Sequence, residues 1–191
     1  MKLLFATTNQ GKLREALQIL SEIDLELLSL DSFKKLQDVV VEESGETFEQ
    51  NAFLKAKFYG DKAQILTVAE DAGLMVDALD GQPGVHSARF GSNGGKRNSK
   101  LLRKMKGKQN RLAKFISTLC LYNPLTKQSQ YFKGIVDGSI AKEKRGNEGF
   151  DYDCVFIPQG YTQTFAELGV EVKNQISHRK LALDELKNGL G

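Results

Sequence analysis

The segment Thr7-Thr8-Asn9-Gln10-Gly11-Lys12 lies between a short apolar run, Leu3–Ala6, and a stretch whose apolar residues recur at helical spacing. A helix start offers unpaired backbone N–H groups and the positive end of the helix dipole, both of which attract anions. Lys12 adds a full positive charge. The glycine spacing is not that of a P-loop, and small polar residues also begin helices as simple caps. The segment therefore indicates either a phosphate site or an ordinary helix cap.

A second expected helix start is also positively charged. Ser177 is placed to cap a helix over 178–188, and His178, Arg179 and Lys180 fill its first turn. Cations oppose the helix dipole there, so this composition suggests that an anion or an electron-rich base is received. The alternative is a surface helix whose charges cost little in salt.

Acidic pairs follow two apolar runs that are typical of strands. Val39–Val41 leads into Glu42-Glu43, and Ile65–Ala69 leads into Glu70-Asp71 and the small pair Ala72-Gly73. Sites in α/β sheets usually lie where strands end, and Mg²⁺ binds one or two carboxylates together with waters and phosphates. The pattern favours a magnesium site, although such acids also cap turns.

Two further groups could contribute to a site. Asn51 and Lys55 are four residues apart and so share one face of an expected helix. Phe150-Asp151-Tyr152-Asp153 follows a glycine-bearing segment, and an exposed aromatic ring beside an acid can stack on a base and bind its edge. The alternative for Phe150 is packing beneath a loop.

These residues need strands and helices to position them, and the sequence predicts an alternation of both. A helix with Leu13, Ala16, Leu17 and Leu20 on its buried face follows the first strand. Thr47 and Gln50 predict a capping box at the start of a helix over 48–62. The remaining expected strands span 25–30, 65–69, 74–79, 115–122, 130–140 and 155–157, and a further helix spans 99–105. The expected fold class is α/β, a mixed twisted β-sheet flanked by helices, with two lobes around a central cleft.

Composition limits the class of protein. The 191 residues are 40% hydrophobic, which suits a single domain over 1–191. Cys120 and Cys154 have no metal-ligand spacing, and the chain has neither a signal-like start nor an apolar run near 20 residues. We therefore expect a cytoplasmic protein outside the membrane.

The net charge of +3 hides an uneven distribution, because nine basic residues lie between Lys96 and Lys114 without an acid. No aromatic residue is interleaved for base stacking, so the stretch favours a solvated helix and loop over a nucleic-acid surface. Either way, its positive potential attracts anionic substrates.

Together the segments resemble the noncanonical purine nucleoside triphosphate pyrophosphatases, the inosine and xanthosine triphosphate hydrolases that are also called Ham1-like. The resemblance spans nearly the whole chain, and its motifs occur in family order. They are Thr7-x-Asn9-x-x-Lys12, Glu42 with Gly45, Asn51-Ala52 with Lys55, Asp71-x-Gly73-Leu74, Ser87-Ala88-Arg89, Phe150 to Asp153, Lys173, and Ile176-Ser177-His178-Arg179.

The resemblance implies a role for each matching residue. Thr7 to Lys12, Lys55, Ala72 and Lys173 would hold the triphosphate, Glu42 and Asp71 would hold Mg²⁺, and Asp71 would be the catalytic acid-base residue. Phe150 would stack on the base within the segment Phe150, Asp151, Tyr152 and Asp153. Asp153, His178 and Arg179 would read the base edge. The donors of His178 and Arg179 suit a 6-oxo purine, because a 6-amino group would leave them facing another donor.

The implied reaction releases a nucleoside monophosphate and pyrophosphate from inosine, deoxyinosine or xanthosine triphosphate, and the family suggests a homodimer. The chain departs from the family pattern where Glu70 and Ala72 replace Asp and Ser, and where Asp151 and Cys154 replace Gly and Pro. Two alternatives remain at this level. One is a pyrophosphatase for modified pyrimidine nucleotides, and the other is a nucleotide-binding or RNA-binding protein that has lost catalysis.

Overall fold

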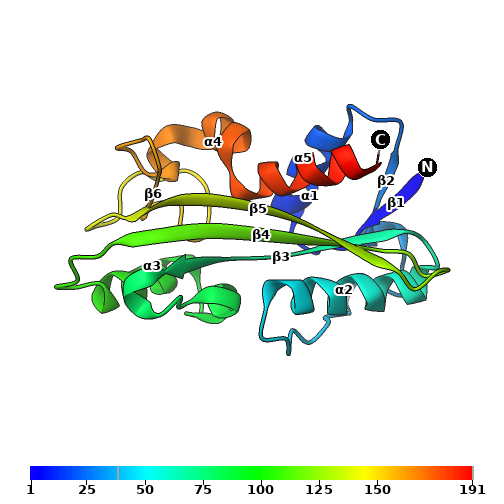
Figure 1. Ribbon diagram of the computed structural model, residues 1–191, viewed down its shortest axis with the longest axis horizontal. Helices are drawn as coiled ribbons and strands as arrows, with labels where there is room; N and C mark the ends of the chain where they lie inside the picture. The colour runs from blue at the N-terminus through cyan, green and yellow to red at the C-terminus, as the bar shows by residue number, and fades with distance from the viewer. Residues whose placement is uncertain (38, 191) are drawn as a thin grey trace. The chain divides into compact units, whose positions relative to one another are not determined.

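The computed structural model describes residues 1–37 and 39–190 as a mixed α/β protein (Figure 1). Its sheet has the strand order β2-β1-β3-β4-β5-β6, with β1 parallel to β2 and β3 and with β5 antiparallel to β6. The strands are β1 (Lys2–Phe5), β2 (Glu26–Ser29), β3 (Thr67–Val76), β4 (Leu112–Tyr122), β5 (Ser129–Ile140) and β6 (Phe156–Pro158). The helices are α1 (Gln10–Leu20), α2 (Phe48–Ala63), α3 (Gly94–Lys104), α4 (Phe165–Ile176) and α5 (His178–Leu190).

The chain forms two compact units. Unit 1 comprises Met1–Asp71, Ser117–Gly134 and Arg179–Gly191, and unit 2 comprises Ala72–Ile116 and Ile135–His178. Strands β3, β4 and β5 each contribute residues to both units. The expected mixed sheet with flanking helices is confirmed. Among the described residues, no helix combines the length and the apolar composition needed to cross a membrane.

The core of unit 1 follows from alternation along β1. Leu3 and Phe5 pack with α1 and α5, whereas Leu4 and Ala6 pack with α2. Successive side chains of a strand point to opposite faces of the sheet, so one strand supplies both layers. Figure 1 shows α1 and α5 on one side of these strands and α2 on the other. Burial of each large apolar side chain contributes about 1.5–3 kcal/mol to holding β1 between these helices.

The core of unit 2 combines aliphatic side chains with several packed aromatic rings. Phe115 of β4 lies against Phe156 of β6 at a centroid distance of 4.6 Å, and Phe156 stacks on Phe165 of α4 at 5.4 Å. Tyr152 from the loop between β5 and β6 belongs to the same buried cluster. The loop that carries the predicted base-binding residues is therefore anchored in this core.

The predicted helix over 48–62 and its capping box are confirmed. The Thr47 hydroxyl accepts from the N–H of Gln50 at 3.1 Å, and the Gln50 side chain accepts from the N–H of Thr47 at 3.2 Å. The strands predicted at 3–6, 25–30, 115–122, 130–140 and 155–157 and the helix at 178–188 are also confirmed, with small shifts at their ends.

Several predicted elements were wrong. The strands expected at 65–69 and 74–79 are one strand, β3, so Glu70-Asp71 lies within a strand and not at its end. The small pair Ala72-Gly73 resembled a turn, but the segment Ala69–Leu74 is mostly buried and takes part in the sheet. Val39–Val41 is not a strand, and Val40 is 87% exposed. Three adjacent β-branched residues therefore do not suffice without a neighbouring strand to pair with.

Helix positions needed correction as well. Leu17 is exposed, and Ile19 contributes to the buried face of α1 in its place. Helix α3 begins at Gly94, five residues before the predicted start, because Asn93 caps it by accepting from the N–H of Lys96. Helix α4 was not predicted, although its start carries a capping box formed by Thr164 and Glu167.

Candidate functional site

The predicted anion segment forms the junction between β1 and α1. The Asn9 side chain accepts from the N–H of Gly11 at 2.9 Å and from that of Lys12 at 3.2 Å, and Thr7 Oγ1 accepts from the N–H of Asn9 at 3.1 Å. The residues Thr8-Asn9-Gln10 are exposed. The first turn of α1, all of which is described, contains no acid. Asn9 is thus a helix cap, and the exposed helix start keeps the positive dipole end that suits an anion.

A buried ion network lies in unit 1 around Glu70. Arg179 Nε donates to the two Glu70 carboxylate oxygens at 3.0 and 2.9 Å, and its Nη1 donates to Glu15 at 2.8 Å. The Ser117 hydroxyl donates to Glu70 at 2.8 Å, and Lys12 Nζ lies 3.4 Å from it. Burial disfavours the charged arginine, but the charges of Glu70 and Glu15 outweigh that effect and raise the pKa of Arg179.

Lys12 and Arg179, which were both predicted to contact substrate, belong to this network. Burial lowers the pKa of Lys12, and the charge of Glu70 opposes that change. The Arg179 side chain is only 2% exposed. Lys12 and Arg179 therefore share one carboxylate, and Arg179 donates to acids of β3 and α1.

Asp71 forms a second polar cluster in unit 1. Lys55 Nζ donates to Asp71 Oδ1 at 3.1 Å and to Glu43 Oε1 at 2.5 Å, and Asn51 Nδ2 donates to Asp71 Oδ2 at 3.3 Å. Asn51 Oδ1 accepts from the N–H of Gly45 at 2.8 Å, which ties the loop before α2 to the helix. Asn51 and Lys55 do share one helix face, and that face meets Asp71.

The electrostatics of Asp71 follow from burial. Its side chain is 9% exposed. Burial raises the pKa of Asp71 and the nearby charge of Glu43 adds to this, although Lys55 acts in the opposite direction. A carboxylate whose pKa is raised binds a proton more readily, which suits a general base.

The cluster also bears on metal binding. No group of three or more His, Cys, Asp or Glu side chains that could hold a metal occurs within residues 1–37 and 39–190. Mg²⁺ needs only one or two protein carboxylates when waters and phosphates complete its shell. Asp71 and Glu43 converge on one ammonium group, as two ligands of a cation would. Glu42, the predicted ligand, is exposed and adjacent to Glu43.

The predicted base-binding segment from Phe150 to Asp153 lies in unit 2 on the loop between β5 and β6. Phe150 is 39% exposed, and Lys173 Nζ lies 4.2 Å from the centre of its ring. Lys173 Nζ also donates to Asp153 Oδ2 at 2.6 Å, and that oxygen accepts from the N–H of Phe150 at 2.8 Å. Burial raises the pKa of Asp153, while Lys173 lowers it. Lys173, predicted to hold phosphate, is thus brought together with Phe150 and Asp153.

The other predicted residues have different surroundings. Tyr152 is buried, and its hydroxyl donates to the carbonyl of Ser87 at 2.8 Å. The ring of His178, which is 5% exposed, stacks on Phe115 with centroids 4.6 Å apart. Ala72 is half-buried next to Asp71. Asp151 pairs with Arg97 of α3.

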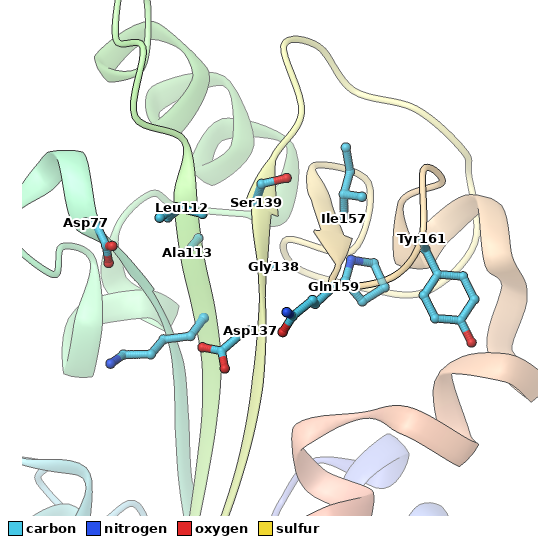
Figure 2. A pocket seen from close by; sticks show the side chains of 11 residues that line it. Asp77, Leu112, Ala113, Asp137, Gly138, Ser139, Ile157, Gln159 and Tyr161 are labelled. Carbon is cyan, nitrogen blue, oxygen red and sulfur yellow. The ribbon is translucent and has the colours of Figure 1, made fainter.

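A separate pocket of about 480 Å³ lies on unit 2. Figure 2 shows it between β4, β5, β6 and the loop after β6, with Asp77, Asp137 and Tyr161 around it. None of the predicted site residues lines it. The candidate site is therefore assigned from the buried charged clusters and not from this hollow.

Sequence reasoning missed Glu15, Ser117 and Arg97, and the family resemblance selected Glu42 from the acidic pair Glu42-Glu43. Glu15 lies three residues after Lys12 on α1, so local spacing could have indicated it. Ser117 and Arg97 contact partners 47 and 54 residues away, and the sequence carries no local signal for them.

The sheet and its flanking helices are features of an α/β protein. Unit 1 holds an exposed helix start and a buried carboxylate–lysine cluster, and unit 2 holds an aromatic ring beside a buried lysine. The model of the Ham1 family matches residues 3–189. The chain belongs to the Ham1 family.

Curated relatives and a solved structure are similar to this chain over nearly its whole length. The dITP/XTP pyrophosphatase of Aquifex aeolicus is 44% identical, covering 97% of this chain and 95% of the relative. That of Geobacter sulfurreducens is 43% identical, covering 100% and 96%. The structure of a HAM1 protein from Coxiella burnetii has a TM-score of 0.92 at 31% identity, covering 100% and 98%.

Proposed function

We propose that the chain hydrolyses inosine, deoxyinosine and xanthosine triphosphates to the nucleoside monophosphate and pyrophosphate, and so removes these purines from the nucleotide pool. Relatives named dITP/XTP pyrophosphatases match at 39–44% identity over 97–100% of the chain, which supports this substrate class. The observation that carries the chemistry is the buried Asp71, bonded to Lys55 and Asn51 and close to a second carboxylate.

Metal dependence forms part of the proposal. Asp71 and one acid of the pair Glu42-Glu43 would hold Mg²⁺. The bound ion would neutralise charge that develops on the phosphates. The carboxylate oxygens that meet at Lys55 are the hard ligands that this ion prefers.

The remaining chemistry is assigned to the chain's own residues. Asp71 accepts a proton from the attacking water as the water oxygen bonds to the α-phosphorus and the bond to the pyrophosphate oxygen breaks. The exposed start of α1 and the ammonium groups of Lys12 and Lys55 stabilise the departing pyrophosphate.

Base selection is assigned to unit 2 and to the first residues of α5. The partly exposed ring of Phe150 would stack on the purine, and Asp153, His178 and Arg179 would read its edge. The contacts of Lys173 support a role beside the base-stacking ring in addition to the predicted one at the phosphates. A 6-oxo group accepts from donors such as His178 and Arg179, whereas a 6-amino group does not.

We also propose a homodimer that acts in the cytoplasm, where the nucleotide pool lies. Light scattering on the purified protein tests the dimer.

The deciding experiment incubates one purified sample with Mg²⁺ and a panel of purine and pyrimidine triphosphates. We expect monophosphate and pyrophosphate from the 6-oxo purines at far higher rates than from ATP. Orthophosphate with a diphosphate would contradict the mechanism, and preference for modified pyrimidines would contradict the base assignment. Salt-dependent RNA binding without turnover would favour a protein that has lost catalysis.

A further inference from the structure

The loop that carries Phe150 is held by a set of contacts from α3. Arg97 Nη2 donates to the Asp151 carboxylate, and Arg97 Nη1 donates to the carbonyl of Ala88 at 2.8 Å. Asn98 Nδ2 donates to the backbone carbonyl of Asp151 at 2.6 Å. Asn98 is 3% exposed and the Arg97 side chain 17% exposed, so both act from partly or fully buried positions. Arg97 therefore binds the side chain of Asp151, and the adjacent Asn98 binds its backbone carbonyl.

Asp151 needs such support because of its backbone conformation. Its φ is +53°, a left-handed value that L-residues other than glycine adopt at a cost. The neighbouring Gly149 has a φ of +80°, and a Cβ there would lie 2.3 Å from Asp153 Oδ2. Phe150 therefore stands between two left-handed residues, and only Gly149 adopts that conformation freely.

The same short segment contains the residues assigned to the base. The N–H of Phe150 donates to Asp153 Oδ2, the oxygen that also binds Lys173. A change in the backbone at Asp151 would move both the ring and this carboxylate. We infer that Arg97 and Asn98 are positioning residues that fix Asp151 in its left-handed conformation and thereby set affinity for the purine base. This inference rests on the proposed function of the loop.

The expected consequence is a defect in binding and not in the chemical step. Arg97→Ala removes a charged hydrogen bond, which is worth about a tenfold change in an equilibrium when lost. We expect KM for dITP to rise about tenfold with kcat changed less than twofold. Arg103→Ala removes an exposed arginine from the same helix and serves as the matched control.

Rescue separates positioning from general damage. Glycine adopts positive φ without strain, so Asp151→Gly in the Arg97→Ala background should recover part of the lost affinity. Hydrogen exchange of residues 146–154 gives a readout without turnover. The exchange rate should rise in Arg97→Ala and remain as in the wild type in Arg103→Ala. It should fall again in the double variant that combines Arg97→Ala with Asp151→Gly. If Arg97→Ala does not fold, Arg97→Lys replaces it in the same measurements. Lysine keeps the positive charge but lacks the two guanidinium donors that bind Asp151 and Ala88.

The outcomes distinguish this inference from the proposed function. Unchanged exchange and unchanged KM in Arg97→Ala would overturn it. A lower melting temperature with normal KM would also overturn it, because the contacts would then be only structural. If the wild-type protein does not turn over dITP, the proposed function and the link to base affinity both fail. The exchange data then still decide whether Arg97 and Asn98 hold the loop.

Discussion

The two candidate clusters are built on different kinds of support. In unit 1, the acids Glu70 and Asp71 lie on strand β3, and their partners Lys55 and Arg179 lie on helices α2 and α5. In unit 2, the residues around Phe150 lie on a loop with several left-handed positions. Residues on strands and helices hold their geometry more closely than residues on loops. The proposed chemistry therefore uses regular elements, and the proposed base recognition uses a loop that other residues must hold.

The clusters also differ in how their charges balance. Glu70 and Glu15 share Arg179, and Asp71 and Glu43 share Lys55, so unit 1 places two acids around each of these cations. In unit 2, by contrast, Asp153 meets the single cation Lys173. Removing Arg179 should thus affect two carboxylates, of which Glu70 keeps its contact with Lys12, whereas removing Lys173 affects one.

The largest expected effect is on catalysis by unit 1. Asp71→Asn removes the proposed proton acceptor and should reduce kcat by roughly 10²–10⁴-fold, the usual contribution of general base catalysis. Nucleotide should still bind, which calorimetry can measure. Asp137→Asn, at an exposed aspartate of unit 2, is the matched control and should leave kcat unchanged. Normal turnover by Asp71→Asn would remove this residue from its role.

The next effect is on stability. Arg179→Met leaves Glu70 and Glu15 without the cation that they share, and breaking a buried pair costs about 3–5 kcal/mol. We expect the free energy of unfolding in urea to fall by the upper part of that range. Lys187→Met, on the same helix and paired with the exposed Glu22, should reduce the free energy of unfolding far less. Equal losses in the two variants would show that the buried network does not stabilise unit 1.

Lys173→Met tests the same idea in unit 2, where the loss should depend on pH. Burial raises the pKa of Asp153 and Lys173 lowers it, so the variant raises the folded pKa further. A carboxyl group with a higher pKa in the folded chain binds more protons there. The free energy of unfolding therefore falls as pH rises from the unfolded to the folded pKa.

We accordingly expect Lys173→Met to lose about 3 kcal/mol at pH 8 and clearly less at pH 5, because Asp153 can take up a proton. Urea unfolding at both pH values measures this difference. Adding Asp153→Asn should remove the pH dependence. A loss that is the same at pH 5 and pH 8 would indicate that Asp153 is not the group responsible.

The sequence predicted the features that have local signals and missed the contacts between distant segments. Periodicity and caps identified α2, β4, β5 and the start of α5, because these signals are local. The spacing of four residues correctly placed Asn51 and Lys55 on one helix face, but their contacts with Asp71 had no local signal. The contacts of Arg179 with Glu70 and Glu15 join segments more than 100 residues apart, and no local pattern encodes them. The strand β3 was divided wrongly because Ala72-Gly73 has the composition of a turn.

The smallest predicted effect decides between two neighbouring acids. The family resemblance assigns a metal-binding role to Glu42, whereas Glu43 shares Lys55 with Asp71 and Glu42 is exposed. We expect Glu43→Gln to raise the Mg²⁺ concentration for half-maximal activity about tenfold, the lower end for loss of a supporting group at a metal site, and Glu42→Gln to raise it less. Titrations of both variants with Mg²⁺ make the comparison. If Glu42→Gln raises the required Mg²⁺ concentration more than Glu43→Gln does, then Glu42, and not Glu43, is the second metal ligand beside Asp71. Binding of substrate and metal would then have to change the conformation of this loop.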